Sequence, residues 1–417
     1  MDVVYRRCCG IDVHKETVAA CMLRWEEGGQ VRKEKKVFGT MTRSLNELAL
    51  WLSQHEVTHV AMEATGVYWE PVWNVLEGQF QLLLINPEHY KGLRGKKTDL
   101  KDGERIGELL QHGLLSGSFV PPREIRALRG LTRHRASLAQ ERVRVFSRIQ
   151  KLLEDANIKL ASVASDVLGL SGAAMLDAIA TGQDDPKKLA EMARGKLRAK
   201  LPALRLALEG RVQEHHRFLL RELLDHEMHL QSQLGKIDGE IARRAVPYEK
   251  TVARWKTIPG VDQITAWSLL AEIGTNMDQF PSPQQLASWA GVCPGNNESA
   301  GKRKSGKTRK GSPWLRRVLC QAAWAASHTK GTYLAAQFRR FAAKRGKKRA
   351  IIGVAHSILV IAYHMLKHAC DYQELGADYF GQINSEGLKR YLVKRLEHLG
   401  YKVQLDAQPQ PSPTACT

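Results

Sequence analysis

The chain has 417 residues, too many for one small hydrophobic core, so its length favours two or three domains. Its 63 Lys and Arg against 43 Asp and Glu give a net charge of +20, which predicts a polyanionic partner, most often nucleic acid. A protein bound to anionic membranes is less favoured, because there is no run of about 18 apolar residues and no signal-peptide pattern. The most apolar segment, residues 350–366, carries two histidines and is predicted to be a buried helix.

The N-terminal part has a mixed α/β pattern. Strands are predicted at 3–13, 17–25, 30–38, 57–63 and 80–86, and helices at 44–55, 66–78 and 98–113. Three meandering strands, a helix, and then strand, helix, strand, loop and helix is the order of elements in the ribonuclease H-like fold. We therefore predict an α/β domain of this fold over residues 1–122.

The middle part has helical periodicity and no strand pattern. Apolar residues recur at helical spacing from Leu128 to Leu152. A second seam approximates a coiled-coil repeat, with Leu219, Leu223, Leu230, Leu234, Ile237 and Ile241. This pattern predicts a long helical coiled-coil hairpin over residues 123–248, which could pack on itself or pair with another protomer.

The C-terminal part carries the excess of positive charge. We predict a mainly α-helical domain over residues 249–375 and a partly disordered, Pro-rich extension over 376–417. From Ser299 to Cys370 the chain has 17 Lys and Arg and no Asp or Glu. A polyanion is therefore expected to dock here, the alternative being a merely solvated basic face.

Four carboxylates stand at points that the predicted fold would bring together. Asp12 lies in the first strand, Glu63 ends the fourth, and Asp99 and Asp102 lie about one turn apart on the last helix. Close together they would repel unless divalent cations neutralised them, and oxygen ligands suit Mg²⁺ or Mn²⁺. Taken singly, each acid could instead shape a turn, cap a helix or face solvent.

Cysteine and histidine give no comparable signal. The seven cysteines form no CxxC pair and no Cys/His spacing suited to zinc. We expect buried or incidental thiols in a reducing cytoplasm, and we assign none of the scattered histidines to a metal.

Two C-terminal segments have features of phosphate binding. The segment "IPGVDQITAWSLLAEIG" (258–274) resembles a helix-hairpin-helix element, in which Gly260 would let backbone N–H groups approach a phosphate; a simple helix turn is the alternative. A polar loop with Ser299 and Ser305 precedes a helix that begins near Pro313. Either serine could attack a phosphodiester or only donate a hydrogen bond to it, and the residues alone favour the second role. The predicted phosphate-binding cations are Lys302, Arg303, Lys304, Lys307, Arg309, Lys310, Arg316 and Arg317.

Several motifs together resemble the transposases of bacterial insertion-sequence family 110, in particular its 1111 subgroup. They are "GIDVHKE", "MEATGVYW", "KTDLKD", "IPGVDQITAWSLLAEIG", "LASWAGVCPG" and "ESAGKRKSGKTRKGSPWLRRVLCQAAWAA". The likeness extends from residue 8 to about residue 370. In the middle region the likeness is limited to the general helical character of the sequence.

The resemblance implies a catalytic site in two parts. A ribonuclease H-like (RuvC-like) domain would bind Mg²⁺ through a DEDD set, whose positions Asp12, Glu63, Asp99 and Asp102 occupy. A C-terminal transposase domain would carry a nucleophilic serine shortly after "GVCP". Ser299, in "ESAG", matches it best by position, and Ser305 is the rival because Gly306 follows it directly.

The resemblance also implies partners. Members of this kind use a structured bridge RNA that pairs with donor and target DNA, and they act as homo-oligomers (dimers or tetramers) whose protomers share composite sites. A bacterial cytoplasmic location follows, at the nucleoid when the protein acts. The alternatives are a metal-dependent Holliday-junction-type nuclease without a covalent intermediate and an inert nucleic-acid-binding protein.

Overall fold

The computed structural model describes residues 2–26, 28–64, 66–86, 99–294, 297–299, 302–305, 307–308, 310–383 and 385–405. For residues 99–101, 297–299, 302–305, 385–386 and 388 it describes the backbone only. The chain forms two compact units, Met1–Val120 and Pro121–Thr417. The four-part division of the sequence stays a prediction.

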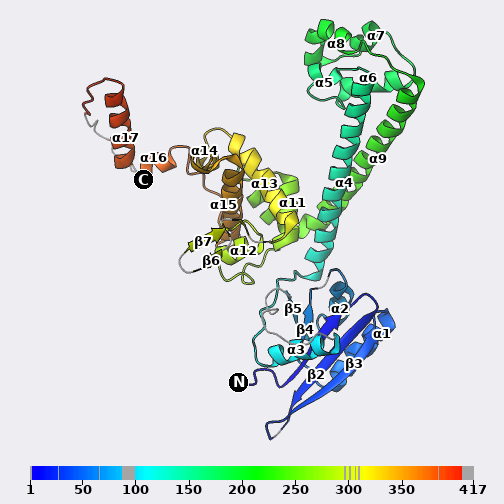
Figure 1. Cartoon of the computed structure of the whole chain (residues 1–417), viewed down its shortest axis with the longest axis vertical. Helices are drawn as coiled ribbons and strands as arrows, with labels where there is room; N and C mark the ends of the chain where they lie inside the picture. Colours follow the sequence, from blue (N-terminus) through cyan, green and yellow to red (C-terminus); the bar gives the residue numbers. More distant parts are fainter. Residues whose placement is uncertain are drawn as a thin grey trace. The chain divides into compact units, whose positions relative to one another are not determined.

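The first unit is built on a five-stranded mixed sheet with the order β3-β2-β1-β4-β5 (Figure 1). The strands are β1 (Arg7–Val13), β2 (Thr17–Trp25), β3 (Val31–Gly39), β4 (His59–Glu63) and β5 (Gln81–Ile85). The first three strands form an antiparallel meander, whereas β4 pairs parallel with β1 and β5 parallel with β4. This mixed α/β arrangement is consistent with the predicted ribonuclease H-like fold.

The two faces of the sheet are covered by different helices. These helices are α1 (Thr42–Gln54), α2 (Trp69–Leu76) and α3 (Asp99–Gln111). Because side chains alternate along a strand, Ile11 and Met62 point into the core beneath α1 and α2. Cys8 and Ala61 point to the other face, where they pack with Ile106 of α3.

The second unit contains two long helices that pack on each other within the chain. These are α4 (Arg123–Asp155) and α9 (Glu214–Ala245), of 33 and 32 residues. Between them come α5 (Leu160–Val163), α6 (Leu170–Ala180), α7 (Pro186–Glu191), a 3₁₀ turn (Gly195–Lys200) and α8 (Leu201–Ala207). Figure 1 shows α4 and α9 side by side, with these short helices at one end. One hydrophobic core joins all these parts.

The predicted seam of α9 is correct in its second half and wrong at its start. Leu230, Leu234 and Ile241 are buried, but Leu219 is 44% exposed and the neighbouring Leu220 is buried instead. A coiled-coil repeat assumes a single partner helix. The first turns of α9 pack against α6 as well as α4. The buried face of the helix is therefore shifted there by one residue, from Leu219 to Leu220.

The rest of the second unit is mainly helical. Its helices are α10 (Glu249–Trp255), α11 (Gln263–Ile273), α12 (Pro283–Trp289), α13 (Pro313–His328), α14 (Tyr333–Arg345), α15 (Lys347–Lys367), α16 (Tyr379–Ile383) and α17 (Ser385–His398), with a 3₁₀ turn at Val246–Tyr248. The polar loop predicted around the two serines contains a short hairpin, β6 (Asn297–Ser299) and β7 (Lys302–Ser305).

The predicted apolar helix is present as α15. By length and composition alone it could cross a membrane, a weak indication that core helices of soluble proteins also give. Val354, Ile358 and Leu359 are completely buried, and the helix packs against α13 and α14. The apolar composition of α15 is therefore explained by its place in the core of this unit.

In the first unit, three glycines allow α3 to lie directly on β1. A Cβ atom added at Gly10 would lie 2.2 Å from both the carbonyl oxygen of Gly103 and the amide nitrogen of Gly107. A Cβ atom added at Gly103 would lie 3.7 Å from the amide nitrogen of Asp12. The backbone of α3 thus touches β1 near Asp12, at a separation that any side chain at Gly10 would prevent.

We expect Gly10→Ala to lower the free energy of unfolding by about 1–3 kcal/mol. The added methyl group would overlap backbone atoms of α3, which cannot move aside as a flexible side chain can. Thermal denaturation measures the loss. The control is Gly130→Ala in α4, where nothing lies within 4 Å of an added Cβ atom and alanine favours the helix by up to about 1 kcal/mol. Equal stability of the two variants would contradict the close-contact account.

Candidate functional site

Asp12 and Glu63 lie on neighbouring strands and point to the same face of the sheet. The parallel register pairs Ile11 of β1 with Met62 of β4, so the next residue on each strand is one of the two acids. Both belong to the alternate set that faces α3, as Cys8 and Ala61 do. Adjacent strands are about 4.8 Å apart. The fold therefore brings these two carboxylates together, with Asp12 buried and Glu63 half-buried.

The first turn of α3 brings two further acids to this region. The helix begins at Asp99, and Asp102 directly precedes Gly103, whose backbone lies against β1 beside Asp12. Asp102 is half-buried, and the side chain of Asp99 lies outside the described residues. The backbone thus places the predicted D-x-x-D pair on the helix turn next to Asp12. The functional roles of all four acids stay predictions.

A histidine beside Asp12 was missed in the sequence. His14 Nε2 lies 3.1 Å from Asp12 Oδ2, and the backbone N–H of His14 donates to the Thr17 carbonyl, which closes the turn between β1 and β2. The available signal was its spacing, since residues two apart on an extended strand share a face. The imidazole gives the buried carboxylate a polar neighbour at the edge of the site.

Ion pairs fasten the next turns of α3 to the sheet. Lys33 Nζ on β3 lies 2.8 Å from Glu104 and 2.5 Å from Glu108, and Lys35 Nζ lies 2.5 Å from Glu104. Hydrogen bonds from Lys33 and Lys35 lower the pKa of Glu104, and the hydrogen bonds of Lys33 to Glu104 and Glu108 raise the pKa of Lys33. These pairs neutralise the acids that follow Asp102 and hold α3 on the sheet.

The buried thiols of Cys8 and Cys21 near this face favour the protonated form. Burial raises the pKa of Cys8 to about 12 and that of Cys21 to about 11. Both therefore remain protonated at neutral pH, whereas a nucleophile or metal ligand would need the thiolate.

The serine hairpin lies in the second unit. Its two strands pair antiparallel, with Ser299 opposite Lys302 and Asn297 opposite Ser305. Ser299 is thus the last residue of β6, next to the turn, whereas Ser305 ends β7 near the base of the hairpin. The side chains of both serines lie outside the described residues. The structure separates the two candidates along the hairpin, and the choice between them stays a prediction.

The predicted phosphate-binding residues have different surroundings. Lys307, Lys310 and Arg317 are exposed and Arg316 is half-buried. Arg309 and the side chains of Lys302, Arg303 and Lys304 lie outside the described residues. Exposed basic residues also gather where α14 meets α15, at Lys344, Arg345, Lys347, Lys348 and Arg349. The described cations therefore lie on several elements of the second unit.

Gly260 is needed for packing. Its φ is 85°, and a Cβ atom there would lie 2.3 Å from the carbonyl oxygen of Ala322 in α13. Asp262 caps the following helix, accepting a hydrogen bond of 2.8 Å from the backbone N–H of Thr265. The contact with α13 accounts for the glycine without a ligand. Its role in phosphate binding, and the helix-hairpin-helix assignment, stay predictions.

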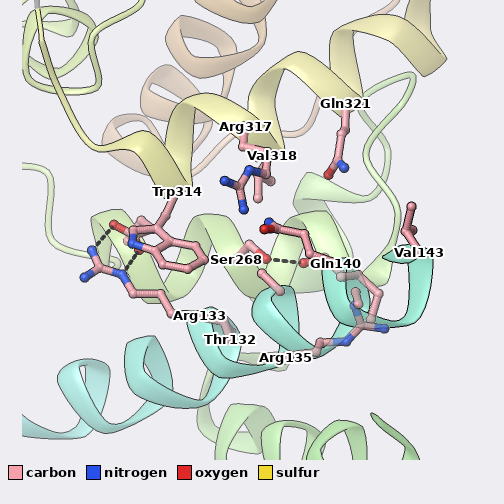
Figure 2. A pocket seen from close by; sticks show the side chains of 14 residues that line it. Thr132, Arg133, Arg135, Gln140, Val143, Ser268, Trp314, Arg317, Val318 and Gln321 are labelled. Carbon is pink, nitrogen blue, oxygen red and sulfur yellow. Dashed lines mark hydrogen bonds and ion pairs between the residues drawn. The ribbon is translucent and has the colours of Figure 1, made fainter. Parts of the chain in front are cut away.

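A cavity of about 220 Å³ lies where α4, α11 and α13 meet (Figure 2). The Trp314 indole forms cation–π contacts with Arg133 and Arg317, whose guanidinium carbons lie 5.8 and 5.3 Å from the ring centroid. Glu272, 2% exposed, lies in the wall of the cavity. No sequence motif indicated this group, because its members come from three separate segments.

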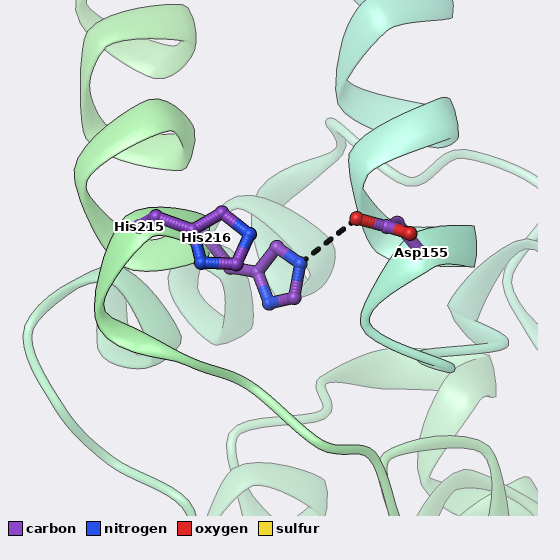
Figure 3. A group of neighbouring side chains, drawn as sticks. All are labelled: Asp155, His215 and His216. Atoms are coloured by element: carbon purple, nitrogen blue, oxygen red, sulfur yellow. Dashed lines mark hydrogen bonds and ion pairs between the residues drawn. The ribbon is translucent and has the colours of Figure 1, made fainter.

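One group with metal-type donors among the described side chains lies at the end of the long helices (Figure 3). Asp155, His215 and His216 place one ligand atom each within 4.8 Å of one another. His216 Nδ1 accepts the backbone N–H of Gln213 at 3.1 Å, and its Nε2 lies 3.0 Å from Asp155 Oδ2. A ring nitrogen that accepts carries no proton, so Nε2 carries it and donates to the carboxylate. The contact with Gln213 is part of the N-cap of α9, and a metal at Nε2 would have to displace the proton that Nε2 carries.

We expect the ion pairs of Glu104 to stabilise the first unit in a pH-dependent way. A lowered carboxyl pKa contributes stability above the unfolded value, near 4.5, and the contribution is lost as the pH falls through the folded pKa. Glu104→Gln should therefore cost stability at pH 7, and the difference from wild type should shrink between pH 5 and pH 3. Thermal unfolding across this range measures it. Glu47→Gln, which loses only an exposed pair with Arg43, is the control, and a constant difference for Glu104→Gln would contradict the account.

Two family models match separate segments of the chain. A family model described as a transposase, of the DEDD type of the IS110 family, matches residues 9–158 and includes all four acids. A second, described as a transposase of the IS116/IS110/IS902 family, matches residues 252–339 and includes the serine hairpin. Together the two matches cover more than half of the chain. No curated protein sequence matches it.

Proposed function

The chain is a DNA transposase of the IS110/IS116/IS902 family, and on that basis we propose that it cuts and rejoins DNA with four carboxylates and a serine. The observation that carries the proposal is the placement of Asp12 and Glu63 side by side on the face that the first turn of α3 covers. That turn carries Asp99 and Asp102. The four acids lie within one family match and Ser299 within the other.

The donor set fits Mg²⁺ or Mn²⁺. Asp12 and Glu63 provide hard oxygen ligands from adjacent strands, and Asp102, with Asp99, would complete the set from α3. Such an ion, when bound, would offset the repulsion among the carboxylates and stabilise negative charge on a phosphate. The chain's own part would be to hold these oxygens in place, and the close contact of Gly10 with Gly103 and Gly107, which sets the distance of α3 from β1, supports this role.

Ser299 would act as the nucleophile. Its Oγ forms a bond to phosphorus while the bond from phosphorus to one deoxyribose oxygen breaks; the serine gives up its proton and the departing oxygen gains one. The phosphoserine linkage keeps the energy of the broken bond, so a hydroxyl of another strand can reverse the step and rejoin DNA. Water as nucleophile would release that energy, as in a nuclease.

Guidance by a bridge RNA and action as a dimer or tetramer are further parts of the proposal. Their support is the resemblance of the motifs and the net charge of +20, which suits more than one nucleic-acid partner. Sequencing the RNA that co-purifies with the protein tests the first part. A structured RNA that redirects integration is the expected result, and protein free of structured RNA would contradict it.

The nucleophile is tested by trapping protein with DNA of the element ends under denaturing conditions. Wild type and Ser305→Ala should form a covalent adduct that requires a divalent ion. Ser299→Ala should form none, a loss of at least about 10³-fold, because the proposed ester forms on the Ser299 hydroxyl that this variant lacks. Asp12→Ala and Glu63→Ala should lose both the adduct and strand cleavage.

The alternative is a Holliday-junction-type nuclease, which predicts a different pattern. Cleavage by wild type without any adduct, with Ser299→Ala as active as wild type, would favour that nuclease. Loss of the adduct in Ser305→Ala but not in Ser299→Ala would move the nucleophile to Ser305.

A further inference from the structure

Glu272 is a buried carboxylate at the C-terminal end of α11 that joins three helices. It accepts two hydrogen bonds from Arg133 of α4, 2.7 Å from Nε and 3.0 Å from Nη2. Arg129, one turn earlier on α4, donates to the backbone carbonyls of Ala271 and Glu272 at 3.0 and 2.7 Å. Bidentate, charge-assisted bonds of this kind are strong and directional. The long helix α4 is thereby fixed to the end of α11.

The third partner of Glu272 is Ser312, the residue before α13. Its hydroxyl donates to Glu272 Oε2 at 3.1 Å and accepts from the backbone N–H of Leu315 at 3.3 Å. It is therefore both the N-cap of α13 and a ligand of the buried acid. Lys310, two residues before Ser312, belongs to the segment by which the chain leaves the serine hairpin.

The two chain segments that enter and leave the serine hairpin are held together just beside Ser312. We call residues 289–294, 308 and 310–312 the neck. Pro294 and Thr308 form an antiparallel bridge, and the Ser312 N–H donates to the Trp289 carbonyl. A Cβ atom added at Gly311 would lie 2.3 Å from the amide nitrogen of Gly291. The neck is thus closely packed, and Ser312 joins it to Glu272.

We propose that Glu272 is a positioning residue, which couples the long helix α4 through Ser312 to the neck and so sets the place of the serine hairpin. The consequence for strand cleavage rests on the proposed function, but the coupling itself does not. Arg133 also contacts Trp314, the second residue of α13 (Figure 2). The start of α13 is thus linked to α4 directly through Trp314 and indirectly through Glu272. A displacement of α4 is transmitted to the neck.

The chain offers a matched control. Glu227 of α9 is also a buried carboxylate, 6% exposed, and accepts from Arg142 of the same helix α4 at 2.6 Å. It joins α4 to α9 and has no bond to the neck. Glu227→Gln therefore removes a comparable charge pair from α4 and leaves the coupling to Ser312 intact.

The test measures hydrogen exchange of the neck amides and the single-turnover rate of strand cleavage, both with the full-length protein. Glu272→Gln and Ser312→Asp should speed neck exchange and slow cleavage by roughly tenfold or more each, because both weaken or remove the charge-assisted bond between Ser312 and Glu272, with DNA affinity unchanged. Ser312→Asp keeps the cap acceptor but cannot donate to Glu272. Ser312→Thr keeps both functions and Glu227→Gln spares the neck, so both should behave as wild type.

A double variant separates positioning from simple loss of stability. In Ser312→Asp with Glu272→Gln, the amide can donate to the new carboxylate, so neck protection and cleavage should recover. Wild-type neck exchange in both single variants, or an equal effect of Glu227→Gln, would overturn the proposal. Absence of cleavage by wild type would contradict the proposed function, while the exchange result would still decide the coupling.

Discussion

The contact between α3 and β1 is the constraint on which the candidate site depends. Gly10, Gly103 and Gly107 let two backbones meet without side chains between them. Only at that separation can the first turn of α3 carry its acids to the strand ends where Asp12 and Glu63 lie. Further along the helix, Glu104 and Glu108 are neutralised by lysines of β3. The glycines set the separation, and the ion pairs hold the helix on the sheet.

In the second unit, the position of the serine hairpin also depends on contacts made by neighbouring elements. A hairpin of two short strands has little stability of its own, so its position must come from what holds its ends. Close glycine packing at Gly311 and the buried acid Glu272 provide this. Because Glu272 also binds Arg133, the long helix α4 shares one network with the start of α13. The sequence on both sides of Ser305 is rich in Lys and Arg, a composition suited to a polyanion.

The fold of the first unit could be predicted from the sequence because its signals are local. Alternation and apolar runs indicated the strands, and the order of elements indicated the sheet. Asp12 and Glu63 followed from the same pattern, since each stands at a fixed place on its strand. The spacing of Asp99 and Asp102 placed them on one helix turn.

Features that depend on distant partners could not be predicted. The start of the α9 seam shifted because α6 adds a second partner, which no single-helix pattern contains. The role of Gly10 needs the position of α3, about 90 residues away along the chain. Glu272, Arg133 and Ser312 have ordinary sequence surroundings, and their network exists only once α4, α11 and α13 have packed. Family resemblance, rather than periodicity, indicated Ser299.

The most direct test of the carboxylate site is to map the metal on the protein itself. Fe²⁺ that replaces Mg²⁺ reacts with added hydrogen peroxide to give Fe³⁺, hydroxide and hydroxyl radicals, and the radicals cut the backbone near the bound ion. The account predicts cuts close to Asp12, Glu63 and the Asp99–Asp102 turn, suppressed by excess Mg²⁺ and absent in Asp12→Asn. Cuts confined to Asp155 and His215, or cuts that Mg²⁺ does not suppress, would contradict it.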